Sequence, residues 1–241
     1  MGVHLHHPAK ALSVSTDNRN ELASVCIGHT DSSTETDIPC TRVVITAGPW
    51  STRVFEELFG PSATPPRITS LAGYSLVVKT PNWSEEDEKA CFAVFSSGNQ
   101  GFSPELISRM GGEIYIAGLN SSALPLPNLP TDRQVKTEEI ERLKSAAKDI
   151  IRVASGSSEF EIIRQEVCFR PVTETGSPTL GRIPDSHLGG SITTRPGAEG
   201  GVYLAAGHGP WGISLSLGTG KVMAELMQGQ DPSAEISQLS P

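Results

Sequence analysis

The chain has 241 residues, and its 19 basic and 27 acidic side chains give a net charge of -8. This balance argues against a nucleic-acid partner, because phosphate neutralisation needs clustered Lys and Arg, and the sequence contains no such cluster. No apolar run approaches the roughly 20 residues of a membrane span, so we expect a cytoplasmic protein with no membrane partner. The four cysteines are scattered without zinc-ligand spacing, and no metal site is expected.

The first forty residues predict a pair of short strands around a polar turn. His4, His6 and His7 alternate along the first stretch, where they either bind a metal or lie exposed on a strand. Residues 43–46 then form a continuous apolar run that ends before Gly48, which predicts a strand buried on both faces.

The middle of the chain predicts a helix, an antiparallel sheet and a second helix. A helical spacing of hydrophobic residues follows Ser51 and ends at Gly60. Thr137 can cap a second helix, whose apolar face would pack on the sheet. A turn at residues 155–158 leads to a strand over residues 160–169. The sheet itself is predicted from strands at residues 68–78, 91–96 and 113–117.

The segment from Gly201 to Gly229 is the most informative part of the sequence. It contains a short apolar strand, the letters GHGPWG and an amphipathic helix. A strand that enters a glycine-dense turn before a helix presents bare amides and the positive end of a helix dipole to a ligand. The letters also satisfy G-x-G-x-x-G, but too little chain follows for the second strand that a dinucleotide fingerprint needs. We therefore expect a flat or negatively charged ligand here.

Three stretches together resemble the D-amino acid oxidase family of FAD-dependent oxidoreductases, which includes glycine oxidase and sarcosine oxidase. They read TRVVITAGPWS, CFRPVTETGSPTLGRIPD and GVYLAAGHGPWGISLSLGTGK, in the order found in that family. GYSLVV, GEIYIAGLNSS and TEEIERLKSAAKDII agree as well, so the resemblance covers most of the chain from Gly2 to Gly229. It implies FAD as the cofactor and a small amine or amino acid as the substrate.

The fold implied by the resemblance is mixed α/β. A partial, Rossmann-like FAD-binding domain is expected at residues 1–52 and 165–241, and an inserted antiparallel-sheet substrate domain at residues 53–164. Members of the family open with a strand, a glycine turn and a helix that hold the ADP half of FAD, and nothing before Thr41 supplies them. The chain therefore resembles a C-terminal portion of such an oxidoreductase.

The resemblance also assigns roles to residues near the glycine turns. Gly48 and Trp50 match positions beside the cofactor, although a turn with a core aromatic residue explains them equally well. Pro210 removes one amide from a turn where close relatives have Gly. The residues that match the turn whose amides face the flavin ring are Gly209, Trp211, Gly212, Ile213 and Ser214.

Three further residues have both a functional and a structural explanation. Arg170 matches the arginine that grips the substrate carboxylate, a task that suits its planar fork, but an ion pair with Glu174 is the alternative. Cys168 stands where sarcosine oxidases bond flavin covalently, and a buried inert thiol is the favoured alternative. His208 invites a general-base role, whereas a histidine between two glycines usually serves the turn.

The sequence thus predicts an FAD-dependent oxidoreductase that oxidises a C–N bond of an amine or amino acid, impaired by the loss of the ADP-binding segment. The alternative is a non-catalytic remnant, or a partner module that does not bind FAD by itself. A NAD-dependent dehydrogenase is disfavoured because no second strand follows the single G-x-G-x-x-G match.

Overall fold

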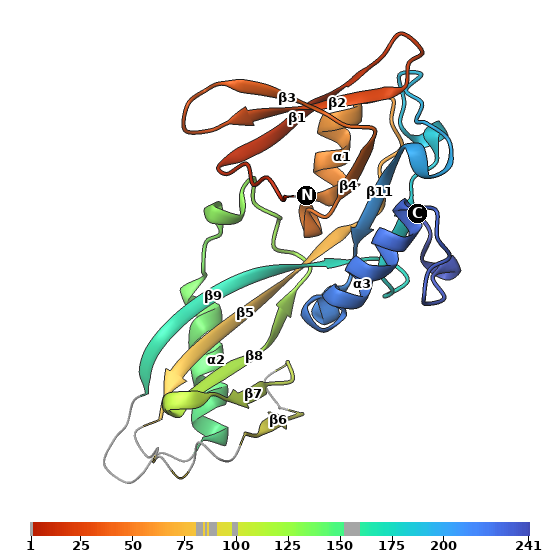
Figure 1. Ribbon diagram of the computed structural model, residues 1–241. Helices are drawn as coiled ribbons and strands as arrows, with labels where there is room; N and C mark the ends of the chain where they lie inside the picture. The colour runs from red at the N-terminus through yellow and green to blue at the C-terminus, as the bar shows by residue number, and fades with distance from the viewer. Residues whose placement is uncertain (1, 81–83, 85, 87–90, 98–100, 152–159) are drawn as a thin grey trace. The chain divides into compact units, whose positions relative to one another are not determined.

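The computed structural model describes residues 2–80, 84, 86, 91–97, 101–151 and 160–241 (Figure 1). The chain divides into two compact units. Unit 1 comprises Met1–Thr69 and Arg170–Pro241, and unit 2 comprises Ser70–Phe169. Each unit has a hydrophobic core of its own. The architecture is mixed α/β, as the sequence predicts.

Unit 1 begins with an antiparallel sheet of three strands. The first two, β1 (Ala9–Thr16) and β2 (Leu22–His29), form the predicted pair. The third, β3 (Glu35–Pro39), was not predicted, because its sequence ETDIP contains a single aliphatic residue, Ile38, and shows no apolar alternation. His6 on the preceding segment lies against His29, with ring centroids 5.9 Å apart.

A second sheet in unit 1 has the order β10-β11-β4. The central strand β11 (Gly201–Ala206) pairs in parallel with β4 (Arg42–Ile45) and antiparallel with β10 (Thr179–Arg182). Helix α1 (Ser51–Phe59) follows β4, and helix α3 (Gly212–Met227) follows β11. The prediction that β4 is buried on both faces is wrong for most of the strand, since only its last residue is fully buried. In the described sheet β4 is an edge strand, which leaves one side less covered.

The two helices cover opposite faces of this sheet (Figure 1). Phe55 of α1 packs in the cluster that contains Ile45 and Leu204. Met223 of α3 packs with Tyr203, which points to the other face because side chains alternate along a strand. Because α1 is part of the unit 1 core, the chain leaves this unit after Thr69, later than the predicted boundary at residue 53. It returns at Arg170, whereas residue 165 was expected.

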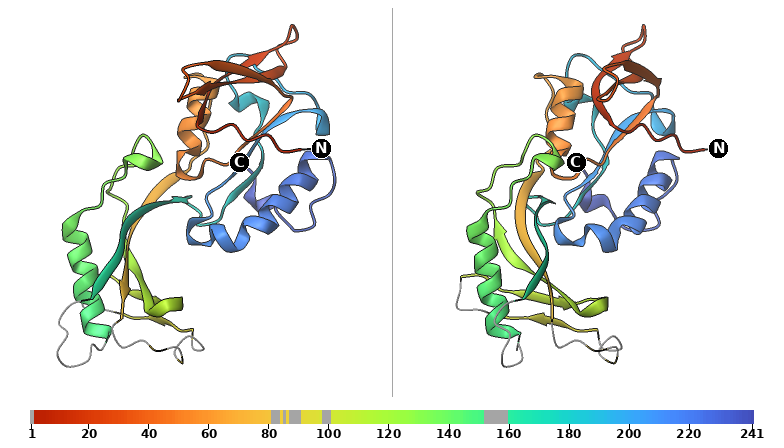
Figure 2. Two further views of the ribbon diagram at one scale, coloured as in Figure 1. Left: turned by 60° about the vertical axis from the view of Figure 1, so that its left-hand side comes forward. Right: turned by 90° about the vertical axis from the view of Figure 1, so that its left-hand side faces the viewer.

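Unit 2 is a five-stranded sheet covered on one face by α2 (Thr137–Ile150), as Figure 2 shows. Ile140, Leu143 and Ala147 of the helix are buried against Leu76 and Ile116 of the sheet. The strands, in spatial order, are β6 (Ala93–Phe95), β7 (Glu105–Ser108), β8 (Glu113–Ser121), β5 (Thr69–Lys79) and β9 (Glu161–Val172).

Three details of unit 2 differ from the prediction. Strand β7 was missed, because its four residues give too short an apolar pattern. Thr137 is not the cap of α2: Lys136 occupies that position with an extended backbone, and no side chain caps the helix. The predicted turn at residues 155–158 lies outside the described residues.

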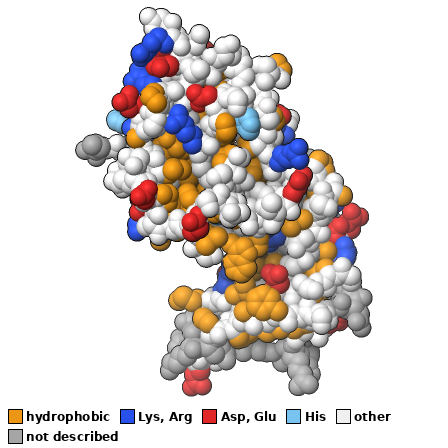
Figure 3. Space-filling model, turned by 90° about the vertical axis from the view of Figure 1, so that its right-hand side faces the viewer, with side chains coloured by type: hydrophobic (Ala, Val, Ile, Leu, Met, Phe, Trp, Pro, Cys, Tyr) orange, Lys and Arg blue, Asp and Glu red, His pale blue; other side chains and the backbone are white. Residues whose placement is uncertain are grey.

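The first half of α3 exposes hydrophobic side chains. Ile213 is 94% exposed and Leu217 is 88% exposed, and Trp211 just before the helix is 65% exposed. Figure 3 views the right-hand side of the molecule as drawn in Figure 1, on which hydrophobic side chains are visible among polar ones. Only from Val222 onward does α3 bury side chains in unit 1. The helix is therefore anchored at its C-terminal half.

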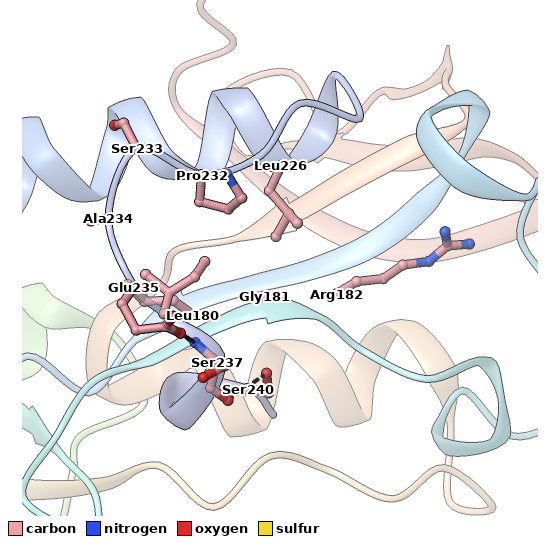
Figure 4. A pocket seen from close by; sticks show the side chains of 11 residues that line it. Leu180, Gly181, Arg182, Leu226, Pro232, Ser233, Ala234, Glu235, Ser237 and Ser240 are labelled. Atoms are coloured by element: carbon pink, nitrogen blue, oxygen red, sulfur yellow. Dashed lines mark hydrogen bonds between the residues drawn. The ribbon is translucent and has the colours of Figure 1, made fainter.

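The segment that follows α3 wraps around the outer edge of β10. Ile236 and Leu239 pack with Leu180 on the α3 face of the strand. Pro241 reaches the opposite face, where a Cβ added to Gly181 would lie 3.2 Å from the Pro241 Cδ. A cavity of about 620 Å³ lies between this segment, α3 and β10 (Figure 4). The segment thus covers a sheet edge that would otherwise be open to pairing.

We expect the substitution Ile236→Ala to lower the free energy of unfolding of unit 1 by about 2 kcal/mol, the low end for a large-to-small aliphatic change, because the side chain is half-buried. Urea denaturation of the full chain measures this change. Gln238→Ala is the matched control, since residue 238 is exposed on the same segment. Equal midpoints for the two variants would contradict the packing role of Ile236.

Candidate functional site

Two Gly-Pro-Trp turns lie at the carboxyl ends of neighbouring parallel strands. Strand β4 leads into the turn Gly48–Trp50 and then α1, and strand β11 leads into the turn Gly209–Trp211 and then α3. The two glycines have left-handed φ values of 55° and 56°, which favour glycine. The helices leave toward opposite faces of the sheet. Ligands of open α/β sheets bind at such a switch point, outside the carboxyl ends of the strands.

The backbone at these turns is open to close approach. Among the described residues, a Cβ added at Gly48 would meet no atom within 4 Å, and one at Gly209 would meet only Val172 Cγ1, at 4.0 Å. At Gly212, the added Cβ would lie 3.8 Å from the Cβ of His208, an ordinary contact. The structure therefore brings the predicted glycines of both turns to one edge of the sheet, where nothing crowds them.

The start of α3 offers unshielded positive dipole charge. No side chain caps the helix, and its first turn holds no acidic residue. The Ser214 hydroxyl donates locally to the carbonyl of Trp211, at 3.3 Å. Because the Ile213 side chain points into solvent, any contribution of Ile213 and Ser214 to a ligand site would come from their backbone amides.

The end of strand β9 lies beside the α3 turn. Gly207 has a φ of 87°, and a Cβ added there would lie 2.6 Å from Thr173 Cγ2. Arg170 is three residues before Thr173, is half-buried, and has a partner within the protein. Glu174 forms an ion pair with Arg67, with 3.8 Å between the charged atoms. The predicted carboxylate-binding arginine is thus on β9, the strand whose end lies beside the α3 turn.

His208 bonds to α3 through its side chain. Its Nε2 lies 2.9 Å from the Thr219 hydroxyl. Burial lowers the pKa of His208 from its ordinary value of 6.5, because the charged imidazolium is disfavoured away from water. The ring lines a cavity of about 420 Å³ between the small residues of α3, such as Ser216 and Gly220, and strand β4. Sequence reasoning missed this bond, since eleven residues separate the two partners.

The Ser51 hydroxyl at the start of α1 is buried and has no hydrogen-bond partner among the described residues. It directly follows the first Gly-Pro-Trp turn. An unpaired buried hydroxyl costs free energy. Packing alone therefore does not explain a serine at this position next to the turn.

Other candidates do not form a second site. Cys168 is an exposed free thiol on β9, which corrects the expectation that it is buried. Within the described residues no three His, Cys, Asp or Glu side chains converge as a metal site would require. Arg182 lines the cavity beside β10, but its guanidinium already donates to Thr194, Arg195 and Gly197. In the described part of the chain, no helix combines the length and apolar character needed to cross a membrane.

The chain is similar in sequence to known proteins. A family model described as "FAD dependent oxidoreductase" matches residues 1–226. A Schizosaccharomyces pombe protein named as an oxidoreductase is 28% identical over 227 residues, covering 93% of this chain and 51% of the relative. A D-amino acid dehydrogenase of Agrobacterium fabrum is 28% identical over 135 residues, covering 56% of this chain and 27% of the relative.

Solved structures share the fold. Glycine oxidase from Geobacillus kaustophilus superposes with a TM-score of 0.66 at 20% identity, covering 96% of this chain and 51% of the other. The chain thus spans about half the length of the Schizosaccharomyces pombe relative and of this oxidase.

We expect Gly207→Ala to destabilise unit 1 by about 2 kcal/mol or more. The left-handed φ of 87° disfavours any side chain, and the new methyl group would press on the stiff, β-branched Thr173 at 2.6 Å. Thermal unfolding of the full chain measures the effect. Gly218→Ala is the opposite-sign control: it is exposed within α3, meets no atom within 4 Å, and should stabilise by about 1 kcal/mol. A neutral Gly207→Ala would contradict the close contact between this turn and Thr173.

Stability should also depend on the titration of His208. Because its folded-state pKa lies below 6.5, the unfolded chain binds the proton more readily. The contribution of His208 is therefore fully present above pH 6.5 and is lost as the pH falls from there toward the folded pKa. The free energy of unfolding, measured by urea denaturation at several values between about pH 8 and about pH 5, should fall more for the wild type than for His208→Gln. Parallel curves would refute this dependence.

Proposed function

The chain belongs to the FAD dependent oxidoreductase family, and on that premise we propose that it oxidises a C–N bond of an amine or amino acid with FAD as cofactor. The observation that carries the proposal is the pair of open Gly-Pro-Trp turns at the ends of two parallel strands. Both turns start helices, so their amides and dipoles favour a ligand that accepts hydrogen bonds or carries negative charge.

The residues present fit part of an FAD molecule. Open backbone at Gly48 and Gly209 allows the close approach that a flat ring needs. The uncapped amides at the start of α3, from Gly212 to Ser214, would face the ring and favour the electron-rich form. When bound, FAD supplies the acceptor for the hydride that leaves the substrate.

We assign unit 1 to the cofactor and unit 2 to the substrate. Arg170, although it is in unit 1, is proposed to hold the substrate carboxylate through two parallel hydrogen bonds, which would fix the orientation of the neighbouring carbon. Trp50 and Trp211 are the last residues of the two turns that would face the cofactor. Burial lowers the pKa of His208, and its ring is hydrogen-bonded to Thr219. We therefore assign His208 to the structure of the turn and not to the role of proton acceptor.

A second candidate function is that of a partner module that does not bind FAD alone. The exposed Ile213 and Leu217 on α3, and the edge position of β4 in the described sheet, favour a further strand and helix beside them. A unit that holds the ADP half of FAD would fit this surface, because it would extend the parallel pairing of β4 and β11. The relatives are about twice as long as the matched region, which is consistent with such a unit.

Titration of the purified full chain with FAD distinguishes the two candidates. Yellow protein with quenched flavin fluorescence supports the first, whereas colourless protein that takes up no FAD supports the second. If the first holds, Gly212→Ala should weaken FAD binding about tenfold or more, which corresponds to about 1.4 kcal/mol.

Gly212 is the position at which a substitution best separates an effect on FAD binding from an effect on stability. It has an ordinary helical backbone and room for a methyl group, so Gly212→Ala should not destabilise the free protein. Gly218→Ala makes the same chemical change about two turns later in α3 and should leave FAD binding unchanged. Equal FAD affinities for the two variants would contradict the assignment of the α3 turn to the flavin.

A further inference from the structure

The N-terminal half of α3 has little to hold it in place. Every residue from 213 to 218 is exposed, and the first fully buried side chains of the helix are Val222 and Met223. Glycine at positions 218 and 220, inside the helix, further weakens it, because each glycine in a helix interior costs about 1 kcal/mol relative to alanine. The start of α3, which carries the proposed flavin-facing amides, therefore needs a tie to the rest of unit 1.

The C-terminal half of α3 is tied in two ways. Val222 and Met223 pack with Leu180 and Tyr203 of the sheet. The guanidinium of Arg42, at the start of β4, donates to the carbonyl of Met227 at 2.9 Å. A cation at a helix C-terminus also complements the dipole. These contacts fix the far end of the helix, about two turns or more from the glycine turn.

The near end is joined to the turn by His208 and Thr219. The His208 ring comes from the turn itself, between Gly207 and Gly209, and its Nε2 lies 2.9 Å from the Thr219 hydroxyl. Thr219 lies seven residues into α3, so the bond spans about two helical turns. Both side chains are half-buried, which shields the bond from competing water.

We propose that His208 and Thr219 form a clamp that positions the amides of Gly209 and of residues 211–214 relative to the sheet. Only the purpose of the clamp, which is to place these amides against the flavin, rests on the proposed function. The hydrogen bond between His208 and Thr219 does not depend on FAD. His208 is a positioning residue in this scheme, because it acts through the turn and touches no reacting atom. The requirement for the clamp follows from the exposed, glycine-containing start of α3.

Hydrogen–deuterium exchange of the full chain tests the clamp. His208→Ala and Thr219→Val should each speed exchange about fivefold at the amides of residues 216–221, which are bonded within α3, because each variant loses one hydrogen bond. Thr219→Ser keeps the hydroxyl and should retain the wild-type rate. Ser216→Ala is the matched control, since its hydroxyl donates within α3 to the carbonyl of Ile213. Exchange in α2 should not change in any variant.

The outcomes separate the clamp from the proposed function. Faster exchange in His208→Ala and Thr219→Val, with rescue by Thr219→Ser, supports the clamp. Where the wild type binds FAD, the same two variants should also bind it more weakly, with an altered visible spectrum. Faster exchange in a chain that binds no FAD supports the clamp and overturns the flavin proposal. Unchanged exchange in both variants overturns the clamp, and Thr219→Val decides alone if His208→Ala fails to fold.

Discussion

The parallel pairing of β4 with β11 is the constraint on which the rest of unit 1 depends. Residues 42–45 and 201–204 are far apart in sequence, and their backbone pairing sets both Gly-Pro-Trp turns at one edge of the sheet. Since both strands run in the same direction, both following helices begin at that edge. Without this pairing, the two turns would be unrelated loops, and neither dipole would contribute to a common site.

Backbone groups, more than side chains, give this edge its chemistry. Gly48, Gly209 and Gly212 leave room for a ligand, and the uncapped amides of α3 provide donors. Such a site has weak side-chain specificity but a strong preference for flat or negatively charged groups. Family membership and the glycine oxidase-like fold are consistent with FAD as that group.

The first half of α3, which follows the second of these open turns, is itself exposed to solvent. A helix usually buries one apolar face, whereas Ile213 and Leu217 lie in solvent. Hydrophobic surface of this kind commonly marks an interaction site. The covered edge at β10 contrasts with it, because there the segment through Ile236 and Leu239 already packs against the strand. The β10 edge of the sheet is thus covered, whereas the first half of α3, on one face of the sheet, is not.

The sequence by itself determined the family, the mixed α/β class and most strands and helices. Apolar periodicity marked α1, α2 and β5, and the linked glycine motifs marked the turn at Gly209, because these signals are local. It missed β3 and β7, whose short or polar stretches gain order only from a neighbouring strand. Only the tertiary structure placed α1 in the core of unit 1, set the two Gly-Pro-Trp turns side by side, and joined His208 to Thr219. These features depend on contacts between distant residues, which no local pattern encodes.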